Sequence, residues 1–200
     1  MSAHLLTKED QFKGTATFAA QYDDMAIILN YRAVHILMNY AFPQLKSGMQ
    51  ILDLGVGTGL IAEEMVNRGL EVVIDGVDQS EHMLEKARDK GRYRHLVKAD
   101  LIKLRETVLP EQEYDAVISC GVYGDYVNLK YLVQAMELVK SRGILAVAGR
   151  GKFQRTLTKA GIEVLVNEIG YAHNCKVLST VNYNYWVGVK NNAEAKEILK

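Results

Sequence analysis

Three glycines at alternate positions, with an aspartate shortly before them, carry the strongest chemical signal of the sequence. Gly55, Gly57 and Gly59 follow the apolar run 50–54, and an amphipathic stretch begins directly after them at Leu60. Glycine lets a backbone turn sharply and approach a bound ligand closely. A loop that joins a strand to a helix lies at the carboxyl edge of an open α/β sheet, where ligands bind. The segment therefore predicts a ligand-binding turn.

The charge beside this turn indicates what it can hold. Asp53 lies two residues before the first glycine, and the glycine spacing is G-x-G-x-G, with Leu60 in the place of the third glycine of the dinucleotide fingerprint G-x-G-x-x-G. A carboxylate repels a pyrophosphate and attracts a cation. Because S-adenosylmethionine carries a sulfonium and an ammonium and no phosphate, the loop fits this ligand better than NAD.

Two more acids lie where later strands are expected to end. Asp78 closes the apolar run 72–78, where a carboxylate can accept both hydroxyls of a ribose, whether the ligand is NAD or S-adenosylmethionine. Asp100 closes the run 95–100, and a carboxylate with the next backbone amide complements the amine and a ring nitrogen of adenine. An aspartate at a strand end is often only a helix cap. Acids at three successive strand ends nevertheless favour a nucleoside-binding edge.

The elements that must position these residues follow a regular alternation. Short apolar runs at 50–54, 72–78, 95–100, 114–119 and 143–149 alternate with helical patterns at 60–68, 80–90 and 129–139. This order predicts a doubly wound α/β sheet, and Ser80 is the expected cap of the second helix. A helical segment over residues 15–42, closed by Pro43, precedes it. The runs 161–170 and 182–190 predict two antiparallel strands, because eleven residues between them leave little room for a crossover helix.

Composition narrows the functional classes. The 200 residues are 48% hydrophobic, with 24 basic and 24 acidic side chains, so the basic excess typical of nucleic-acid-binding proteins is missing. The two cysteines, Cys120 and Cys175, form no metal-binding pattern with the histidines, so no metal site is expected. No apolar stretch near the N-terminus is long enough for a signal peptide or a membrane span. We expect a cytoplasmic protein with reduced thiols and no nucleic-acid or membrane partner.

The motifs together resemble the core of the class I S-adenosylmethionine-dependent methyltransferases. The matching segments are LDLGVGTG (52–59), GVDQSEHMLEKAR (76–88), KADL (98–101), EYDAVISCGVY (113–123) and GILAVAG (143–149). With the preceding segment 19–33, the chain is similar to the methyltransferase-like proteins named for the Williams–Beuren region and to their small bacterial relatives. The resemblance implies one domain, with a helical lid over 1–45, a cofactor-binding core over 46–150, and a helix with an antiparallel strand pair over 151–200. The implied seven-stranded sheet has the order 3-2-1-4-5-7-6, with strand 7 antiparallel.

The resemblance also implies a role for each cofactor-binding residue. For the methionine part of the cofactor, it implies that Gly55, Gly57 and Gly59 border the methionine chain and that Asp53 lies near the amino end. For the sulfonium, it implies a floor of Ser119, Cys120 and Gly121 and a cover of Tyr22 and Tyr31. For the nucleoside, it implies that Asp78 holds the ribose, that Gln79 and Met83 flank the adenine, and that Asp100 and Leu101 face the adenine edge.

The acceptor is less well indicated than the cofactor. We expect in-line methyl transfer to a small molecule, with Tyr123 and His173 as acid/base candidates and Asp125 also within reach. Many relatives carry a longer segment where residues 150–160 predict only a short helix. The acceptor pocket is therefore open, or completed by Tyr183, Tyr185 and the N-terminal helix.

Other readings of the sequence remain open. A non-catalytic cofactor-binding module, or an enzyme that uses S-adenosylmethionine for chemistry such as cyclisation, would carry the same motifs. Tyr126 and Lys130 have the Y-x-x-x-K spacing of short-chain dehydrogenases, but they lack the dinucleotide glycine pattern. Cys120 follows a serine instead of the proline that precedes the nucleophile in cytosine-C5 methylation, so a small wall residue is expected there. No motif indicates an oligomeric state.

Overall fold

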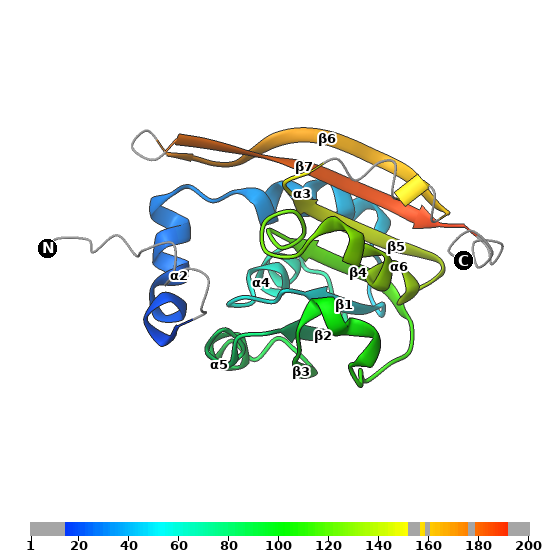
Figure 1. Cartoon of the computed structure of the whole chain (residues 1–200), viewed down its shortest axis with the longest axis horizontal. Helices are drawn as coiled ribbons and strands as arrows, with labels where there is room; N and C mark the ends of the chain where they lie inside the picture. The colour runs from blue at the N-terminus through cyan, green and yellow to red at the C-terminus, as the bar shows by residue number, and fades with distance from the viewer. Residues whose placement is uncertain (1–14, 152–156, 159–160, 176–178, 192–200) are drawn as a thin grey trace, which may run out of the picture.

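The protein is described by a computed structural model that covers residues 15–151, 157–158, 161–175 and 179–191. A seven-stranded sheet in the order β3-β2-β1-β4-β5-β7-β6 organises it (Figure 1). The strands are β1 (Gln50–Leu54), β2 (Val73–Asp78), β3 (His95–Lys98), β4 (Tyr114–Cys120), β5 (Val139–Gly149), β6 (Ile162–Cys175) and β7 (Ser179–Lys190). Strands β1 to β5 pair in parallel, and β7 is antiparallel to both β5 and β6. The predicted fold class and sheet order are confirmed.

The central strands are apolar on consecutive positions because both faces of the sheet are covered. Ile51 and Ile118 belong to one buried cluster, whereas the neighbouring Leu52 and Val117 belong to the other. The first cluster includes residues of α3 (Ala33–Ala41) and α4 (Leu60–Asn67), and the second includes residues of α6 (Leu132–Glu137) and of the 3-10 helix η2 (Leu101–Glu106). Successive residues of a strand point to opposite faces, so each strand contributes to both clusters.

The helices of the core lie close to their predicted positions. α4 begins directly after the glycine loop, and α5 (Glu81–Asp89) is capped by Ser80, whose Oγ accepts the backbone N–H of Met83 at 3.4 Å. The predicted helix 129–139 is shorter than expected: a 3-10 turn η3 (Leu129–Tyr131) leads into α6, and Val139 already begins β5.

The N-terminal helical segment is divided into two helices. α2 (Ala16–Ile28) and α3 are separated by Asn30, which has a φ of 49°, and a 3-10 turn η1 (Phe42–Gln44) follows α3. The backbone N–H of Arg32 donates to the carbonyl of Ala172 in β6 at 2.8 Å. This bond fixes the break between the helices against the sheet, a long-range contact that helical periodicity does not reveal.

The antiparallel strand pair is longer than the apolar runs predicted. β6 has 14 residues and β7 has 12, and the hairpin extends toward the side of the molecule where α2 lies (Figure 1). The predicted helix over 151–160 and the polar tail over 191–200 lie largely outside the described residues, as do residues 1–14 of the predicted lid.

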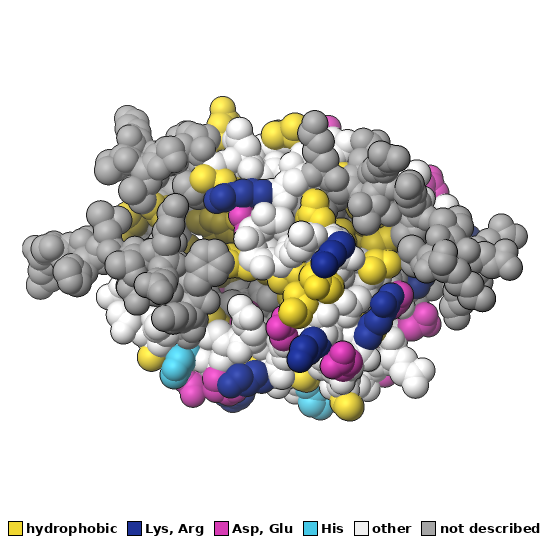
Figure 2. Space-filling model, in the orientation of Figure 1, with side chains coloured by type: hydrophobic (Ala, Val, Ile, Leu, Met, Phe, Trp, Pro, Cys, Tyr) yellow, Lys and Arg dark blue, Asp and Glu magenta, His cyan; other side chains and the backbone are white. Residues whose placement is uncertain are grey.

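Charge and hydropathy of the described residues add two observations. On the face in Figure 2, the Lys and Arg side chains drawn in colour are interspersed with Asp and Glu. Within the described ranges, no helix has the length and apolar character needed to cross a membrane, and no group of three or more His, Cys, Asp or Glu could hold a metal ion.

Candidate cofactor-binding site

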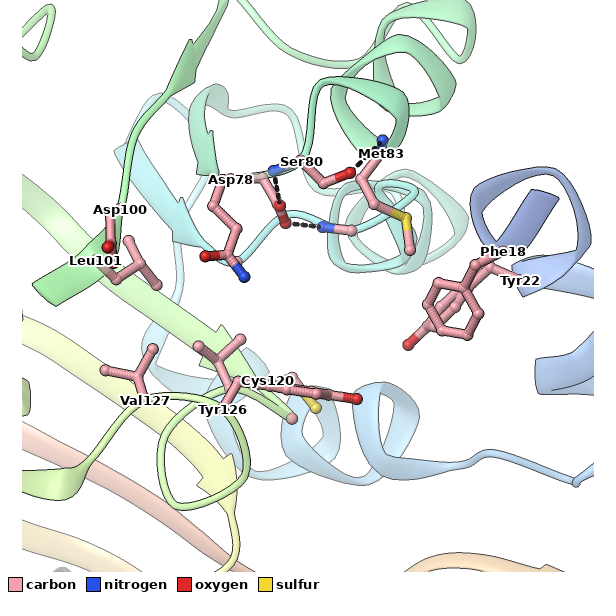
Figure 3. Close-up of a pocket in the computed structure, with 15 residues that line it drawn as sticks. Phe18, Tyr22, Asp78, Ser80, Met83, Asp100, Leu101, Cys120, Tyr126 and Val127 are labelled. Atoms are coloured by element: carbon pink, nitrogen blue, oxygen red, sulfur yellow. Dashed lines mark hydrogen bonds between the residues drawn. The ribbon is translucent and has the colours of Figure 1, made fainter. Parts of the chain in front are cut away.

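A pocket lies at the carboxyl edge of the sheet, between the ends of β1, β2 and β4 and the helix α2 (Figure 3). Ten of the residues predicted to bind the cofactor line it: Tyr22, Gly55, Gly57, Asp78, Gln79, Met83, Asp100, Leu101, Cys120 and Gly121. The parallel strands bring these residues together because their carboxyl ends meet at one edge.

The glycine loop needs glycine for two different reasons. Gly55, Gly57 and Gly59 have φ values of 79°, 54° and 91°, a region that side-chain-bearing residues rarely adopt. A Cβ on Gly55 would also lie 2.2 Å from Cγ2 of Val122, whereas one on Gly57 would meet nothing within 4 Å. The backbone at Gly57 is therefore open to a ligand, while Gly55 is closed by its neighbour.

Asp78 fixes the loop and still has hydrogen-bonding capacity. Its Oδ2 accepts the backbone N–H of Gly57 at 2.8 Å, and its Oδ1 accepts that of Ser80 at 2.9 Å (Figure 3). Burial raises the pKa of this carboxyl, and the backbone N–H groups of Ser80, Gly57 and Gln79 oppose that shift. Because each carboxylate oxygen has two lone pairs, the carboxylate can still accept a hydrogen bond from a ligand hydroxyl.

Asp53 does not line the pocket but is left with an unsatisfied oxygen. The side chain is fully buried, its Oδ2 accepts the Tyr93 hydroxyl at 2.7 Å, and its Oδ1 has no partner among the described residues. Burial raises the pKa of Asp53 to about 7, against the lowering effect of Tyr93, and Asp78 raises it further. A buried carboxylate of this kind is stabilised by a nearby positive charge, so the strand that feeds the loop suits a cationic ligand.

Two other predicted residues support the pocket from behind. The Oγ of Ser119, which is 1% exposed, donates to the carbonyl of Leu54 at 2.7 Å and thereby joins the end of β4 to β1. A Cβ on Gly59 would lie 3.2 Å from the Tyr93 ring and 3.5 Å from Ala87, so this glycine allows the loop to approach α5. Neither residue lines the pocket.

The charged side chains among the described lining residues are all acidic. They are Asp78 and Asp100, and no Lys, Arg or His of the described ranges lines this pocket. Asp100 also caps η2, since its Oδ1 accepts the backbone N–H of Ile102 at 3.0 Å. Helix cap and pocket residue are thus the same side chain. The acidic lining is unfavourable for a pyrophosphate and favourable for a sulfonium or an ammonium.

Aromatic rings close the side opposite the strands. Phe18 and Tyr22 of α2 lie with ring centroids 5.4 Å apart across from Met83 (Figure 3). The sequence analysis missed Phe18, although its position one helical turn before Tyr22 is a usable signal. It also missed Ser80, Val122 and Val127 as lining residues, and it considered Tyr126 only for the dehydrogenase pattern.

Tyr31 approaches the floor of the pocket from between the two N-terminal helices. Its hydroxyl lies 3.7 Å from the Sγ of Cys120, and it lines an adjoining cavity together with Tyr22, Gly55 and Cys120. Burial raises the pKa of the Cys120 thiol to about 12, against the lowering effect of Tyr31. The thiol is therefore protonated at neutral pH, as expected of a wall residue and not of a nucleophile.

Of the two acid/base candidates, only Tyr123 has a described side chain, and it does not line the pocket. Tyr123 is fully buried in the same apolar cluster as Leu132, its hydroxyl has no partner among the described residues, and burial raises its pKa. His173 pairs with Val181 in the β6–β7 ladder, and its side chain lies outside the described structure. Lys130 lies 4.9 Å from the Tyr131 ring centroid and does not line the pocket, so the dehydrogenase pattern has no counterpart there.

Comparison with known proteins identifies the shared part of the chain. Residues 51–143 match the family model described as a methyltransferase domain. A malonyl-[acyl-carrier protein] O-methyltransferase of Acetivibrio thermocellus is 32% identical over 107 residues, which cover 53% of this chain and 37% of that protein. A trans-aconitate 2-methyltransferase of Agrobacterium fabrum is 37% identical over 97 residues, which cover 48% of this chain and 36% of that protein. The chain thus matches less than half the length of these relatives.

A solved structure extends the likeness to the whole fold. The magnesium protoporphyrin IX methyltransferase of Synechocystis PCC 6803, solved with bound S-adenosylmethionine, superposes with a TM-score of 0.66 at 16% identity, over 96% of this chain and 100% of that one. Because of the low identity, this likeness concerns the fold alone. Residues 51–143 are thus similar to a methyltransferase domain, and the observed sheet order is the one that the resemblance to class I S-adenosylmethionine-dependent methyltransferases implies.

Proposed function

We propose that the protein binds S-adenosylmethionine in this pocket and transfers its methyl group to a small-molecule acceptor. One observation carries the proposal: among the described residues, the charges that line the pocket are acidic, and a buried oxygen of Asp53 beside the glycine loop has no hydrogen-bond partner. Both features fit a ligand with two positive charges and a nucleoside. The names of the two relatives support an acceptor outside the nucleic acids.

Each part of the cofactor has a matching group on the chain. For the methionine part, Gly55 and Gly57 would border the methionine chain near Asp53, Cys120 and Gly121 would lie beneath the sulfonium, and Tyr22 and Tyr31 would cover the sulfonium. For the nucleoside, Asp78 would accept the ribose hydroxyls, Gln79 and Met83 would flank the adenine, and Asp100 and Leu101 would face the adenine edge. The Williams–Beuren-type resemblance stays part of this proposal because segment 19–33 supplies both tyrosines.

The bound cofactor supplies a methyl group on a sulfonium, which is already activated for displacement. The chain must therefore hold the acceptor in line with that methyl group and keep water out. The rings of Phe18 and Tyr22 serve the second task, since they form an apolar wall opposite the strands. A base is required only where the acceptor must lose a proton.

Calorimetric titration with S-adenosylmethionine and S-adenosylhomocysteine tests the proposal. We expect one binding site for each compound and none for NAD. Asp78→Asn should weaken binding by about tenfold or more, since each good hydrogen bond to a charged group contributes roughly 1.5–3 kcal/mol. Asp89→Asn, an exposed change at the end of α5, is the matched control.

The products distinguish methyl transfer from other uses of the cofactor. We expect S-adenosylhomocysteine and a methylated acceptor in equal amounts. Folded protein that binds neither compound, or that binds NAD instead, would contradict the proposal. Methylthioadenosine formed from the cofactor alone would contradict methyl transfer while leaving cofactor binding intact.

A further inference from the structure

Two tyrosine hydroxyls from distant parts of the chain meet beside Gly121. This glycine follows β4, lines the pocket and has a φ of 74°. A Cβ there would lie 2.8 Å from the hydroxyl oxygen of Tyr31 and 3.3 Å from that of Tyr183. Both hydroxyls thus lie next to Gly121, just behind the lining of the pocket, and only a glycine at this position leaves room for them.

Tyr183 is held in place by a carboxylate. The residue lies on β7 and is 7% exposed, and its hydroxyl donates to the side chain of Asp125. Asp125 lies in the turn after β4 and is paired with Arg150, whose Nε is 2.8 Å from Oδ1 and whose backbone N–H is 3.4 Å from Oδ2. A phenol that donates its proton to a carboxylate keeps its own oxygen lone pairs for another donor.

The groups around this pair determine its protonation. Burial, together with Asp125, Cys120 and Tyr22, holds the pKa of Tyr183 well above its usual range. Burial also raises the pKa of Asp125, which Arg150 and the hydrogen bond from Tyr183 lower in part. At neutral pH, Tyr183 is accordingly a phenol, and Asp125 is a carboxylate with an increased affinity for a proton.

The remaining neighbours of the pair are uncharged at neutral pH. Tyr31 and Tyr185 lie near Tyr183, the latter with ring centroids 6.5 Å apart, and Tyr126 lies near Asp125. Burial raises the pKa of Tyr31 and of Tyr126. Arg150 is thus the cation in contact with the pair among the described residues.

Building on the methyl-transfer function proposed above, we propose that Tyr183 and Asp125 form a proton relay for an acceptor hydroxyl bound beside Gly121. As the new O–CH3 bond forms and the S–CH3 bond breaks, the acceptor proton passes to the Tyr183 oxygen. The Tyr183 proton passes at the same time to Asp125, which becomes a neutral carboxylic acid. Tyr183 contacts the acceptor and is the catalytic residue, and Asp125 positions it and receives the proton.

The same arrangement indicates the class of acceptor. A carboxylate acceptor has no proton to lose and would leave the relay without a role, and the described lining of the pocket offers it no Lys, Arg or His, since Arg150 is paired with Asp125. The ring of Phe18 and the phenols Tyr22 and Tyr126 provide flat apolar surfaces instead. The relay and these rings together fit a neutral phenol.

A series of phenols with different acidity tests the relay. The probes are phenol, 4-chlorophenol and 4-nitrophenol, with benzoate as the carboxylate, and methyl transfer is followed by mass spectrometry. At pH 7 we expect Tyr183→Phe to lower kcat for phenol by about 10²–10⁴-fold. The loss for 4-nitrophenol should be much smaller, because a substantial fraction of this probe is already ionised at pH 7 and needs no base. The rate of the variant with phenol should rise with pH, tenfold per pH unit, toward the pKa of phenol itself.

Control variants separate the relay from structural damage. Tyr171→Phe removes a phenol hydroxyl from a side chain on β6 that is 58% exposed, and it should leave kcat unchanged. Asp125→Asn should show the same dependence on phenol acidity as Tyr183→Phe, and it keeps the test decisive if the latter variant does not fold. Every variant is first titrated with S-adenosylhomocysteine.

The outcomes distinguish this inference from the function on which it rests. Wild-type protein that does not bind S-adenosylhomocysteine would overturn the proposed methyltransferase function. If it binds but methylates only benzoate, or none of the phenols, the acceptor class is wrong. An equal loss of kcat for all phenols, with an unchanged pH profile, would show a structural role for Tyr183 and overturn the relay.

Discussion

The two sides of the pocket are held in different ways. On the strand side, β1 pairs in parallel with β2 and β4, and Ile51, Leu52 and Leu54 are fully buried. On the opposite side, α2 rests on a small cluster in which Phe18 and Ala19 contact Met83 of α5. Elements with few buried apolar contacts open at a lower free energy than the core. We therefore expect the strand side to keep its geometry and α2 to be the side that opens for a ligand.

The two N-terminal helices, which lie within 26 residues of sequence, differ in burial in the same way as the two sides of the pocket. In α3, Leu37 and Met38 are fully buried in the main core. In α2, Ile27 and Ile28 are 77% and 75% exposed, and polar contacts supplement the small apolar cluster. Asp23 of α2 accepts the Thr58 hydroxyl of the glycine loop at 2.5 Å and pairs with Lys90 at 2.8 Å. We therefore expect α3 to belong to a rigid scaffold and α2 to a cover that opens more readily.

The largest expected effect comes from truncating an apolar side chain on each helix. Leu37→Ala should lower the free energy of unfolding by about 2–5 kcal/mol, because it leaves a cavity in the core. Ile27→Ala should change it by less than about 0.5 kcal/mol, because the side chain is already in water. Urea unfolding measures both. Similar losses for the two variants would contradict the division into scaffold and cover.

Asp53 gives the strand side a distinctive pH dependence. Its folded-state pKa is raised to about 7, so between pH 4 and pH 7 the folded protein binds a proton that the unfolded chain has released. This contribution to the free energy of unfolding is present below pH 4 and is lost as the pH rises toward 7, in total about 2–4 kcal/mol. Asp53→Asn should remove it. Urea unfolding at several pH values, compared between variant and wild type, measures the difference.

Binding of the cofactor should remove the proton that Asp53 carries in the free protein. A cationic cofactor near Asp53 favours the charged carboxylate, so binding near pH 7 should release a proton. Calorimetry in buffers of different ionisation enthalpy measures that release, which Asp53→Asn should abolish. An unchanged release in the variant would show that another group gives up the proton.

The sequence predicted the strand side of the pocket far better than its cover. Asp53, Asp78, Asp100 and the glycines lie at ends of apolar runs, and in a parallel sheet these ends share one edge, so local patterns were enough. The pairing of Tyr183 with Asp125 depends on how β7 reverses along β5, which no local pattern encodes. The break at Asn30 depends likewise on a contact with β6.

Burial explains the weakest part of the sequence analysis. Tyr123 directly follows a strand that leads to the pocket, yet its ring turns into the apolar cluster that contains Leu132 and Trp186. A residue near a strand end can face the pocket or either side of the sheet, and the sequence does not distinguish these directions. Tyr126, three residues later, lines the pocket instead.

Alanine substitutions at two glycines with similar backbone conformations distinguish an effect on stability from an effect on ligand binding. Gly57 and Gly48 have φ values of 54° and 86°, and a Cβ on either would meet nothing within 4 Å. Each change to alanine should therefore destabilise the fold by roughly 1–2 kcal/mol through backbone strain. Only Gly57→Ala should weaken binding of S-adenosylhomocysteine, by about tenfold, because Gly57 lines the pocket and Gly48 does not. Equal affinities would show that the ligand does not approach this part of the loop.

The smallest expected effect concerns the polar contact that holds the cover. Asp23→Asn removes the charge that pairs with Lys90 but keeps an oxygen that can accept the Thr58 hydroxyl proton. Because the carboxylate is 43% exposed, the free energy of unfolding should change by less than about 0.5 kcal/mol. Opening of α2 depends on far fewer contacts than global unfolding, so its amide exchange should accelerate about twofold while exchange in α3 stays the same.

Asp24→Asn, an exposed neighbour on the same helix, should alter neither rate. S-adenosylhomocysteine should slow exchange in α2 in all three proteins, and equal exchange with and without this ligand would contradict the role of α2 as a cover that closes on the cofactor.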